Sequence, residues 1–168
     1  LIIIDDASTD NSLKKIKKIS NKDKRIKILR NKSNKGKAGS INRGFKHVKG
    51  DFITFCDADD LFYPERLKKQ ISFMKRNKEV DLAYGDMIKF WEDGQEKLRK
   101  AITFKNFSEP LKRLKKESQL KKDYLGAFAI LDTKDYIPGT SVFFRRKIIE
   151  TGIKMDESMW YEDCDFNF

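Results

Sequence analysis

Short apolar runs alternate with amphipathic stretches along most of this chain, and this alternation constrains the fold more than any other feature. Runs rich in Ile, Val, Phe or Leu are predicted to be strands. They are Leu1–Ile4, Arg25–Leu29, Asp51–Cys56 and Val80–Tyr84. The stretches between them space their apolar residues like one face of a helix. They are Ser12–Ser20, Ala38–Lys49 and Pro64–Asn77. This order predicts an α/β fold with a mostly parallel, Rossmann-like sheet flanked by helices.

The rest of the chain is less regular. Residues 93–135 are charged and weakly periodic, which indicates an excursion from the sheet with a helix near Glu109–Lys122. A further strand is expected at Ser141–Phe144, and a short helix at Arg145–Thr151 that ends at Gly152. Without repeats or a linker, the 168 residues are interpreted as one domain, truncated at both ends.

Composition excludes several classes of protein. No apolar run approaches the roughly 20 residues of a membrane span. A single histidine, His47, rules out both a Ser/His/Asp triad and a His-rich zinc site within this sequence. Cys56 and Cys164 have no metal-binding spacing, so they are interpreted as small, partly buried apolar residues.

The net charge is +11, which indicates either a Lys-rich solvated surface or attraction to anions such as a nucleotide, an acidic glycan or a lipid surface. Ten Lys or Arg residues lie between Lys97 and Lys122, but the aromatic residues there are not interleaved in a stacking pattern. We therefore expect no nucleic-acid partner.

An acidic cluster, Asp57-Ala58-Asp59-Asp60, follows the third predicted strand. Ligands of α/β sheets bind at the carboxyl ends of the strands. In extended backbone, side chains at i and i+2 point the same way, so Asp57 and Asp59 could hold one Mg²⁺ or Mn²⁺ with phosphate oxygens completing its shell. The alternative is a polar turn before the helix at Pro64.

Two further segments have the character of a nucleotide site. Asp5 and Asp6 follow the first strand and could accept hydrogen bonds from a base or a ribose, although Ser8, Thr9 or Asp10 could also simply cap the next helix. Residues 34–42 contain Gly36, Lys37 and Gly39 at a helix start, which favours phosphate. The alternative there is a flexible basic loop.

A third acidic group, Glu162-Asp163, lies near the end of the chain. Sugar transfer to a hydroxyl group needs a base that takes the acceptor proton, and a carboxylate can do this. The alternative is an ordinary acidic pair at the surface.

Together these segments resemble the inverting glycosyltransferases of family 2, which have the GT-A fold. The resemblance covers nearly the whole chain, in the order of the family. It rests on LIIIDDASTDNS, NKGKAGSINRGF, GDFITFCDADDLFYPERL and IPGTSVFFRRKIIETGIKMDESMWYEDCDF. Ala7 stands where the family more often has glycine.

The resemblance implies a role for each motif. Asp6, with Asp5 beside it, would bind the base or ribose, and Lys37 the diphosphate. Asp57 and Asp59 would hold ribose and a divalent metal, with Asp60 as a weaker ligand. Asp163 would be the general base and Glu162 the orienting or alternative residue, with inversion by a single displacement.

The family also implies partners and a location. The donor would be a nucleotide-diphosphate sugar, most commonly a UDP-sugar, and the acceptor a glycan or lipid-linked sugar in glycan, capsule or lipopolysaccharide synthesis. The protein would be cytoplasmic, with peripheral association at the inner face of the membrane left open. Two alternatives remain: a phosphotransferase with Asp57 as nucleophile, and a non-catalytic module that binds anionic ligands.

Overall fold

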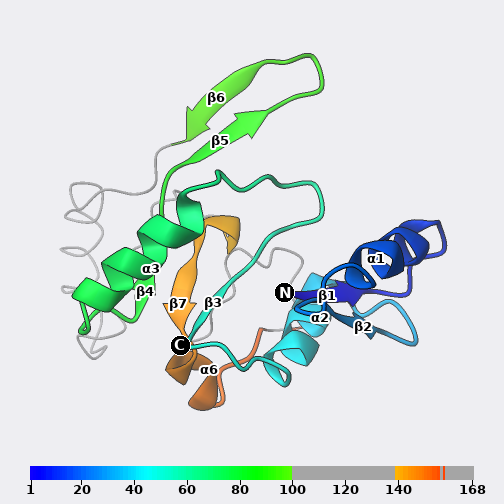
Figure 1. Cartoon of the computed structure of the whole chain (residues 1–168), viewed down its shortest axis with the longest axis horizontal. Helices are drawn as coiled ribbons and strands as arrows, with labels where there is room; N and C mark the ends of the chain where they lie inside the picture. Colours follow the sequence, from blue (N-terminus) through cyan, green and yellow to red (C-terminus); the bar gives the residue numbers. More distant parts are fainter. Residues whose placement is uncertain (100–138, 156, 158–168) are drawn as a thin grey trace, which may run out of the picture. The chain divides into compact units, whose positions relative to one another are not determined.

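The computed structural model describes residues 1–99, 139–155 and 157, which form two compact units (Figure 1). Of the described residues, the first unit contains 1–50, 149–155 and 157, and the second contains 51–99 and 139–148. The interpretation of residues 1–168 as one catalytic domain stays a prediction.

The first unit is built on a parallel strand-helix-strand motif. Strands β1 (Ile2–Asp5) and β2 (Lys27–Arg30) pair in parallel, with Asp5 opposite Arg30. Helix α1 (Ser12–Ser20) connects them, and α2 (Gly36–Phe45) follows β2; both helices contact this strand pair. The predicted helix at Ser12–Ser20 is confirmed residue for residue.

The second unit contains a three-stranded sheet in the order β3-β7-β4. Its strands are β3 (Phe52–Thr54), β4 (Leu82–Ala83) and β7 (Phe143–Arg145). Strand β7 is antiparallel to both neighbours, so β3 and β4 run parallel to each other on either side of it. The expectation of parallel pairing therefore holds for β1 and β2, whereas β7 departs from it.

Aromatic side chains form the core of this sheet. Phe144 is fully buried, and its ring centroid lies 5.7 Å from that of Phe55. Phe143 stacks on Phe52 with centroids 5.3 Å apart. Helix α3 (Arg66–Arg76) adds Met74, which is also fully buried. Arg145 fixes the end of α3 by donating to the carbonyl oxygens of Met74 and Asn77.

A β-hairpin in this unit was not predicted from the sequence. Strands β5 (Met87–Phe90) and β6 (Glu96–Arg99) pair antiparallel around a turn that contains Gly94, whose φ is +82°. The Gly94 N–H donates to the Trp91 carbonyl, and Asp93 accepts a hydrogen bond from the Gln95 N–H at 3.0 Å. The Asp93-Gly94 pair is the signal that could have revealed the hairpin, because such pairs favour tight turns between strands.

The strand predicted at Ser141–Phe144 and the helix predicted at Arg145–Thr151 are both present, with somewhat different bounds. A 3₁₀ turn, Gly139–Ser141, precedes β7, and α6 (Lys147–Glu150) follows it, with Gly152 at a φ of +93°. The helix predicted near Glu109–Lys122 lies outside the described residues. None of the helices in the described residues is both long and apolar enough to cross a bilayer.

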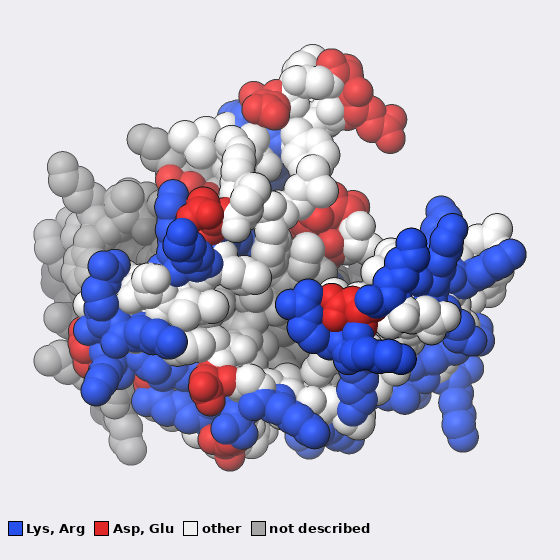
Figure 2. Space-filling view, viewed as in Figure 1, with Lys and Arg blue, Asp and Glu red and all other residues white. Residues whose placement is uncertain are grey.

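Positive charge is concentrated in the first 50 residues. These hold 15 Lys or Arg residues against 4 Asp residues, and the difference of +11 equals the net charge of the whole chain. Figure 2 shows Lys and Arg side chains gathered over α1 and β2. Helix α1 contributes the exposed Lys14, Lys15, Lys17 and Lys18.

Candidate functional site

The Asp57–Asp60 segment forms a tight turn directly after β3. The Asp60 N–H donates to the Asp57 carbonyl at 3.1 Å, so Ala58 and Asp59 occupy the centre of the turn. Asp59 is exposed, and Asp57 and Asp60 are half-buried. The expectation of extended backbone here is wrong. The positions of the Asp57 and Asp59 carboxylates therefore follow from the geometry of this turn and not from the alternation of side chains along a strand.

These three carboxylates create a negative field at the turn. The pKa of the Cys56 thiol is raised, mainly because the thiol is desolvated. The charges of Asp60, Asp57 and Asp59 raise this pKa further, while the charge of Arg66 lowers it. The same thiol lies 3.6 Å from the Asp57 carbonyl and 3.8 Å from that of Asp60. A clustered set of carboxylates with one exposed member suits attraction of a cation.

The donor set of this turn fits a hard divalent cation. Within the described residues, no group of three or more His, Cys, Asp or Glu side chains converges as a preformed metal site. Mg²⁺ characteristically takes one or two carboxylates and completes its shell with water and substrate phosphates, without an all-protein cage. Asp57 and Asp59 are carboxylates of the type that such a partial shell would need.

Asp6 lies in the first unit, just beyond the carboxyl end of β1, at the centre of a hydrogen-bond network. Its carboxylate accepts hydrogen bonds from the Asn31 side chain at 2.6 Å and from the Lys35 N–H at 2.9 Å. Desolvation raises the pKa of Asp6, but hydrogen bonds from Asn31, Lys35, Gly36 and Ser40 outweigh it and leave the pKa below its usual value. Asp6 is therefore a fixed, ionised carboxylate that joins the ends of both parallel strands to the start of α2.

Asp5 differs from its neighbour in accessibility. Its side chain is fully buried, and one carboxylate oxygen lies 3.1 Å from the Arg30 Nε atom. Across the register of β1 and β2, this ion pair closes the end of the sheet. Of the two carboxylates predicted to meet a nucleotide, Asp6 is thus the one that remains partly accessible.

The segment after Asp6 also has a local structural role. Asp10 accepts hydrogen bonds from the Ser12 N–H at 2.9 Å and from its hydroxyl group at 3.0 Å, at the start of α1. The N-cap residue of α1 is Asn11, which makes no side-chain capping hydrogen bond. None of the predicted caps Ser8, Thr9 and Asp10 therefore occupies that position, although Asp10 accepts from the first helical residue. Asp6 makes separate hydrogen bonds, so this role of Asp10 is compatible with a ligand-binding role of Asp6.

Ala7 adopts a left-handed backbone conformation, with a φ of 61°. Among the described residues it is the one non-glycine residue with a positive φ. A Cβ atom there costs about 1–2 kcal/mol. Glycine, which adopts this backbone conformation without strain, would suit the position better.

We expect Ala7→Gly to raise the free energy of unfolding by about 1 kcal/mol, because it removes that strain. Urea denaturation measures the change. The control is Ala58→Gly, which places glycine in an exposed turn without a positive φ. An equal gain in both variants, or none in Ala7→Gly, would contradict the explanation.

The start of α2 is organised by side chains around it. Gly36 has a φ of +70°, and its N–H donates to the Asn34 side chain at 2.9 Å. Lys37 follows in the first turn and is half-buried. Gly39 is tightly packed, since a Cβ atom there would lie 2.9 Å from the Cβ of Lys35. This loop is ordered by Asp6 and Asn34, which argues against the flexible-loop alternative.

Sequence reasoning did not single out Asn42, which bridges two distant parts of the first unit. Its side chain donates to the Met155 carbonyl at 2.9 Å and accepts from the Met155 N–H at 2.8 Å. It also donates to the Glu157 carboxylate at 3.0 Å. Asn42 therefore fixes the chain five residues before the predicted Glu162-Asp163 motif. Glu162 and Asp163 themselves lie outside the described residues.

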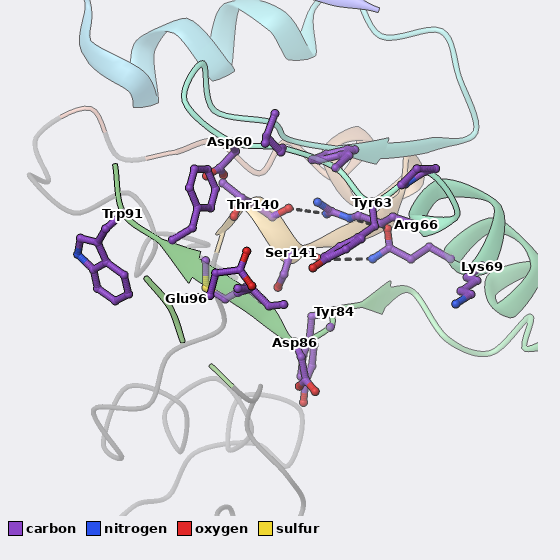
Figure 3. Close-up of a pocket in the computed structure, with 18 of the residues that line it drawn as sticks. Asp60, Tyr63, Arg66, Lys69, Tyr84, Asp86, Trp91, Glu96, Thr140 and Ser141 are labelled. Atoms are coloured by element: carbon purple, nitrogen blue, oxygen red, sulfur yellow. Dashed lines mark hydrogen bonds between the residues drawn. The ribbon is translucent and has the colours of Figure 1, made fainter. Parts of the chain in front are cut away.

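The second unit contains a cavity of about 630 Å³ at the Asp57–Asp60 turn (Figure 3). Asp60 borders it, together with the loop that leads to α3, the β5–β6 hairpin and the Gly139–Ser141 turn. A cavity of this size is suited to a small-molecule ligand.

The family model "Glycosyl transferase family 2" matches residues 1–152. Among curated proteins, an uncharacterized glycosyltransferase of Haemophilus influenzae is 46% identical over 77 residues, which are 46% of this chain and 31% of that protein. WfgD of Escherichia coli, a UDP-Glc:α-D-GlcNAc-diphosphoundecaprenol β-1,3-glucosyltransferase, is 41% identical over 86 residues, 51% of this chain and 33% of that protein. The chain spans about a third of the length of these relatives.

Two solved structures resemble the fold. Staphylococcus aureus TarS in complex with UDP matches 97% of this chain and 43% of its own, with a TM-score of 0.64 and 21% identity. The mannosyltransferase PcManGT of Pyrobaculum calidifontis, in complex with GDP-Man and Mn²⁺, matches 97% of this chain and 40% of its own, with a TM-score of 0.61 and 13% identity. These likenesses confirm the predicted GT-A fold.

Proposed function

The chain belongs to glycosyl transferase family 2, and we propose that the protein is a metal-dependent inverting glycosyltransferase that uses a nucleotide-diphosphate sugar, with UDP as the nucleotide. The Asp57–Asp60 turn carries this proposal. It presents clustered carboxylates directly after β3, where a diphosphate and its cation would need them. The cation, when bound, neutralises the charge that grows on the leaving diphosphate.

For the donor we propose the residue roles that the resemblance to the family implies. Asp6, held ionised by its hydrogen bonds, would accept from the base or the ribose, as its position beyond β1 suggests. Lys37 in the first turn of α2 would contact the diphosphate. Asp57 would contact ribose and metal, and Asp59 the metal, with Asp60 as a weaker ligand.

Transfer would proceed by a single displacement. Asp163 would take the proton of the acceptor hydroxyl group, while Glu162 orients it or serves in its place. The acceptor oxygen forms a bond to the anomeric carbon as the bond from that carbon to the diphosphate breaks. The configuration at this carbon is inverted because attack and departure occur on opposite faces.

We expect UDP binding by the full-length protein to tighten with Mn²⁺, and Asp59→Ala to weaken this Mn²⁺-assisted binding by about tenfold or more, because an oxygen ligand of the metal is lost. Calorimetry with UDP, in the presence and absence of Mn²⁺, measures this. The control is Asp93→Ala, which removes a carboxylate from the β5–β6 turn. If Asp59→Ala leaves the metal-assisted binding unchanged, the assignment of Asp59 to the metal is wrong. If GDP binds more tightly than UDP, the assignment of UDP as the nucleotide is wrong.

The acceptor would be a glycan or a lipid-linked sugar, in glycan, capsule or lipopolysaccharide synthesis. WfgD, by its name, acts on a diphosphoundecaprenol-linked sugar. The +11 charge of residues 1–50 would favour the anionic inner face of a membrane, where such acceptors lie. The protein would then be cytoplasmic and peripherally bound.

We expect the full-length protein to sediment with phosphatidylglycerol vesicles and to dissociate as salt is raised, since surface charges are screened within about 8 Å at physiological ionic strength. Reversing Lys14 and Lys18 to Glu on α1 should reduce binding, whereas Lys75→Glu at the end of α3 should have a smaller effect. Equal binding to uncharged phosphatidylcholine vesicles would contradict this electrostatic mode.

A further inference from the structure

Aromatic and acidic side chains line the 630 Å³ cavity of the second unit together. The aromatic residues are Phe62, Tyr63, Tyr84, Phe90 and Trp91. Several of these rings remain unusually open to solvent: Tyr63 is 66% exposed, Phe90 50% and Trp91 49%. Large rings so exposed around one cavity, and not scattered over the surface, indicate a binding site.

The polar groups of the cavity identify the chemistry of its ligand. Asp60, Asp86 and Glu96 contribute three carboxylates, against the two cationic residues Arg66 and Lys69. Arg66 is engaged within the protein, where its guanidinium donates to Thr54, Gln70 and Thr140. The cavity therefore offers hydrogen-bond acceptors and little free positive charge, which disfavours a phosphate and favours a neutral ligand rich in hydroxyl groups.

A saccharide has both properties that this lining requires. One face of a sugar ring consists of C–H groups, which pack on aromatic rings, and its edge consists of hydroxyl groups, which donate to carboxylates. Figure 3 shows Glu96 between Trp91 and Tyr63 in this view, with Tyr84 and Asp86 nearby. A purely apolar lipid chain would desolvate the Glu96 carboxylate without offering it a hydrogen-bond donor, at a cost.

We propose that this cavity binds a neutral sugar residue of the acceptor, stacked on Trp91 and hydrogen-bonded to Glu96. The saccharide assignment stands on the cavity itself. Its identification as acceptor rests on the proposed function, because Asp60 belongs both to the cavity and to the turn that would hold the donor diphosphate. The β5–β6 hairpin, which carries Phe90, Trp91 and Glu96, would then be the element that selects the acceptor.

The test measures saccharide binding by the full-length protein without nucleotide or metal. Saturation-transfer NMR is recorded with the methyl glycosides of glucose, galactose, mannose, rhamnose and N-acetylglucosamine, at tens of millimolar. We expect at least one glycoside to bind, and Trp91→Ala to weaken it by about tenfold or more. Trp91→Phe, which keeps a ring, should retain most of the binding, and Glu96→Gln should lose part of it.

Leu98→Ala is the matched control, because Leu98 lies on the same hairpin, is 54% exposed and does not line the cavity. It should bind the glycoside like the wild type. All four variants should also bind UDP with Mn²⁺ like the wild type, which shows that the fold and the donor site are intact.

Three results would overturn the proposal: no glycoside binds, Leu98→Ala matches Trp91→Ala, or farnesyl phosphate binds in a Trp91-dependent way while the glycosides do not. Glycoside binding that depends on Trp91, in a protein that fails to bind UDP with Mn²⁺, would have a different meaning. It would uphold the sugar site and reject the proposed transferase function, so the two failures are distinguishable.

Discussion

Arg66→Ala is expected to lower the free energy of unfolding by about 3 kcal/mol, because it leaves several partly buried acceptors without a partner. The Arg66 guanidinium donates to the Thr54 hydroxyl group at 3.1 Å, to Gln70 at 3.1 Å and to the Thr140 carbonyl. It also lies 3.9 Å from the centroid of the Phe62 ring. One side chain thus connects β3, α3 and the Gly139–Ser141 turn.

The consequence extends to the Asp57–Asp60 turn. Thr54, which accepts from Arg66, also donates from its hydroxyl group to the Val142 carbonyl at 2.6 Å. Thr54 and Arg66 flank the turn in sequence and are joined by a hydrogen bond. They therefore close the loop that carries the carboxylates of Asp57, Asp59 and Asp60. We therefore expect Arg66→Ala to weaken Mn²⁺-assisted UDP binding as well.

Urea denaturation with Arg76→Ala as control tests this expectation, because Arg76 is an exposed arginine of the same helix. Arg66→Lys should lie between wild type and alanine, since lysine keeps the charge and loses the planar fork of donors. Desolvation lowers the pKa of Arg66, while Cys56 and Asp60 oppose this shift, so the guanidinium remains charged at neutral pH. Equal losses in Arg66→Ala and Arg76→Ala would refute this role.

Asp163→Asn is expected to lower kcat of the full-length enzyme by about 10²–10⁴-fold, the usual contribution of a general base. The amide has the size of the carboxylate but cannot take the acceptor proton. The affinity for UDP with Mn²⁺ should stay unchanged, because the base acts on the acceptor and not on the donor. Turnover of the donor sugar, once identified by a thermal-shift screen of nucleotide sugars, measures the effect.

Asp165→Asn is the matched control, since it removes a carboxylate two residues away in the same acidic segment. Glu162→Gln should show a smaller loss if Glu162 only orients the base. If Asp163→Asn retains wild-type turnover and Glu162→Gln does not, the two roles are exchanged. If neither variant loses turnover, the proton acceptor lies elsewhere.

Local periodicity was sufficient to find most elements of the fold. Buried strands need consecutive β-branched or aromatic residues, and helices need an apolar stripe, so β1, α1 and α3 are visible within a few residues of chain. The order of acidic motifs after strands likewise indicated the family that the comparison with known proteins established. The β5–β6 hairpin is not predicted although Asp93-Gly94 carries the signal, because both strands are short and β6 is largely polar.

Local residue patterns do not predict the direction in which a strand runs in the sheet. Phe143 and Phe144 on β7 are buried, as is Val142 just before it, and such an apolar run has the same appearance whichever way the strand runs. Its antiparallel placement between β3 and β4 depends on partners far away in sequence. Asn42 shows the same limit, since its contacts with Met155 span 113 residues and leave no local pattern.

The sequence by itself determined the α/β class and the family and pointed to the candidate carboxylates, because these follow from local patterns and from the order of motifs. The tertiary structure decided which carboxylates a ligand can reach. Asp5 is buried and paired with the exposed Arg30, while Asp6 stays partly accessible just beyond β1. Asp57 and Asp59 belong to a turn that Arg66 helps to close. The physical reason is that accessibility and orientation come from long-range packing and hydrogen bonds, which a local pattern of residues does not encode.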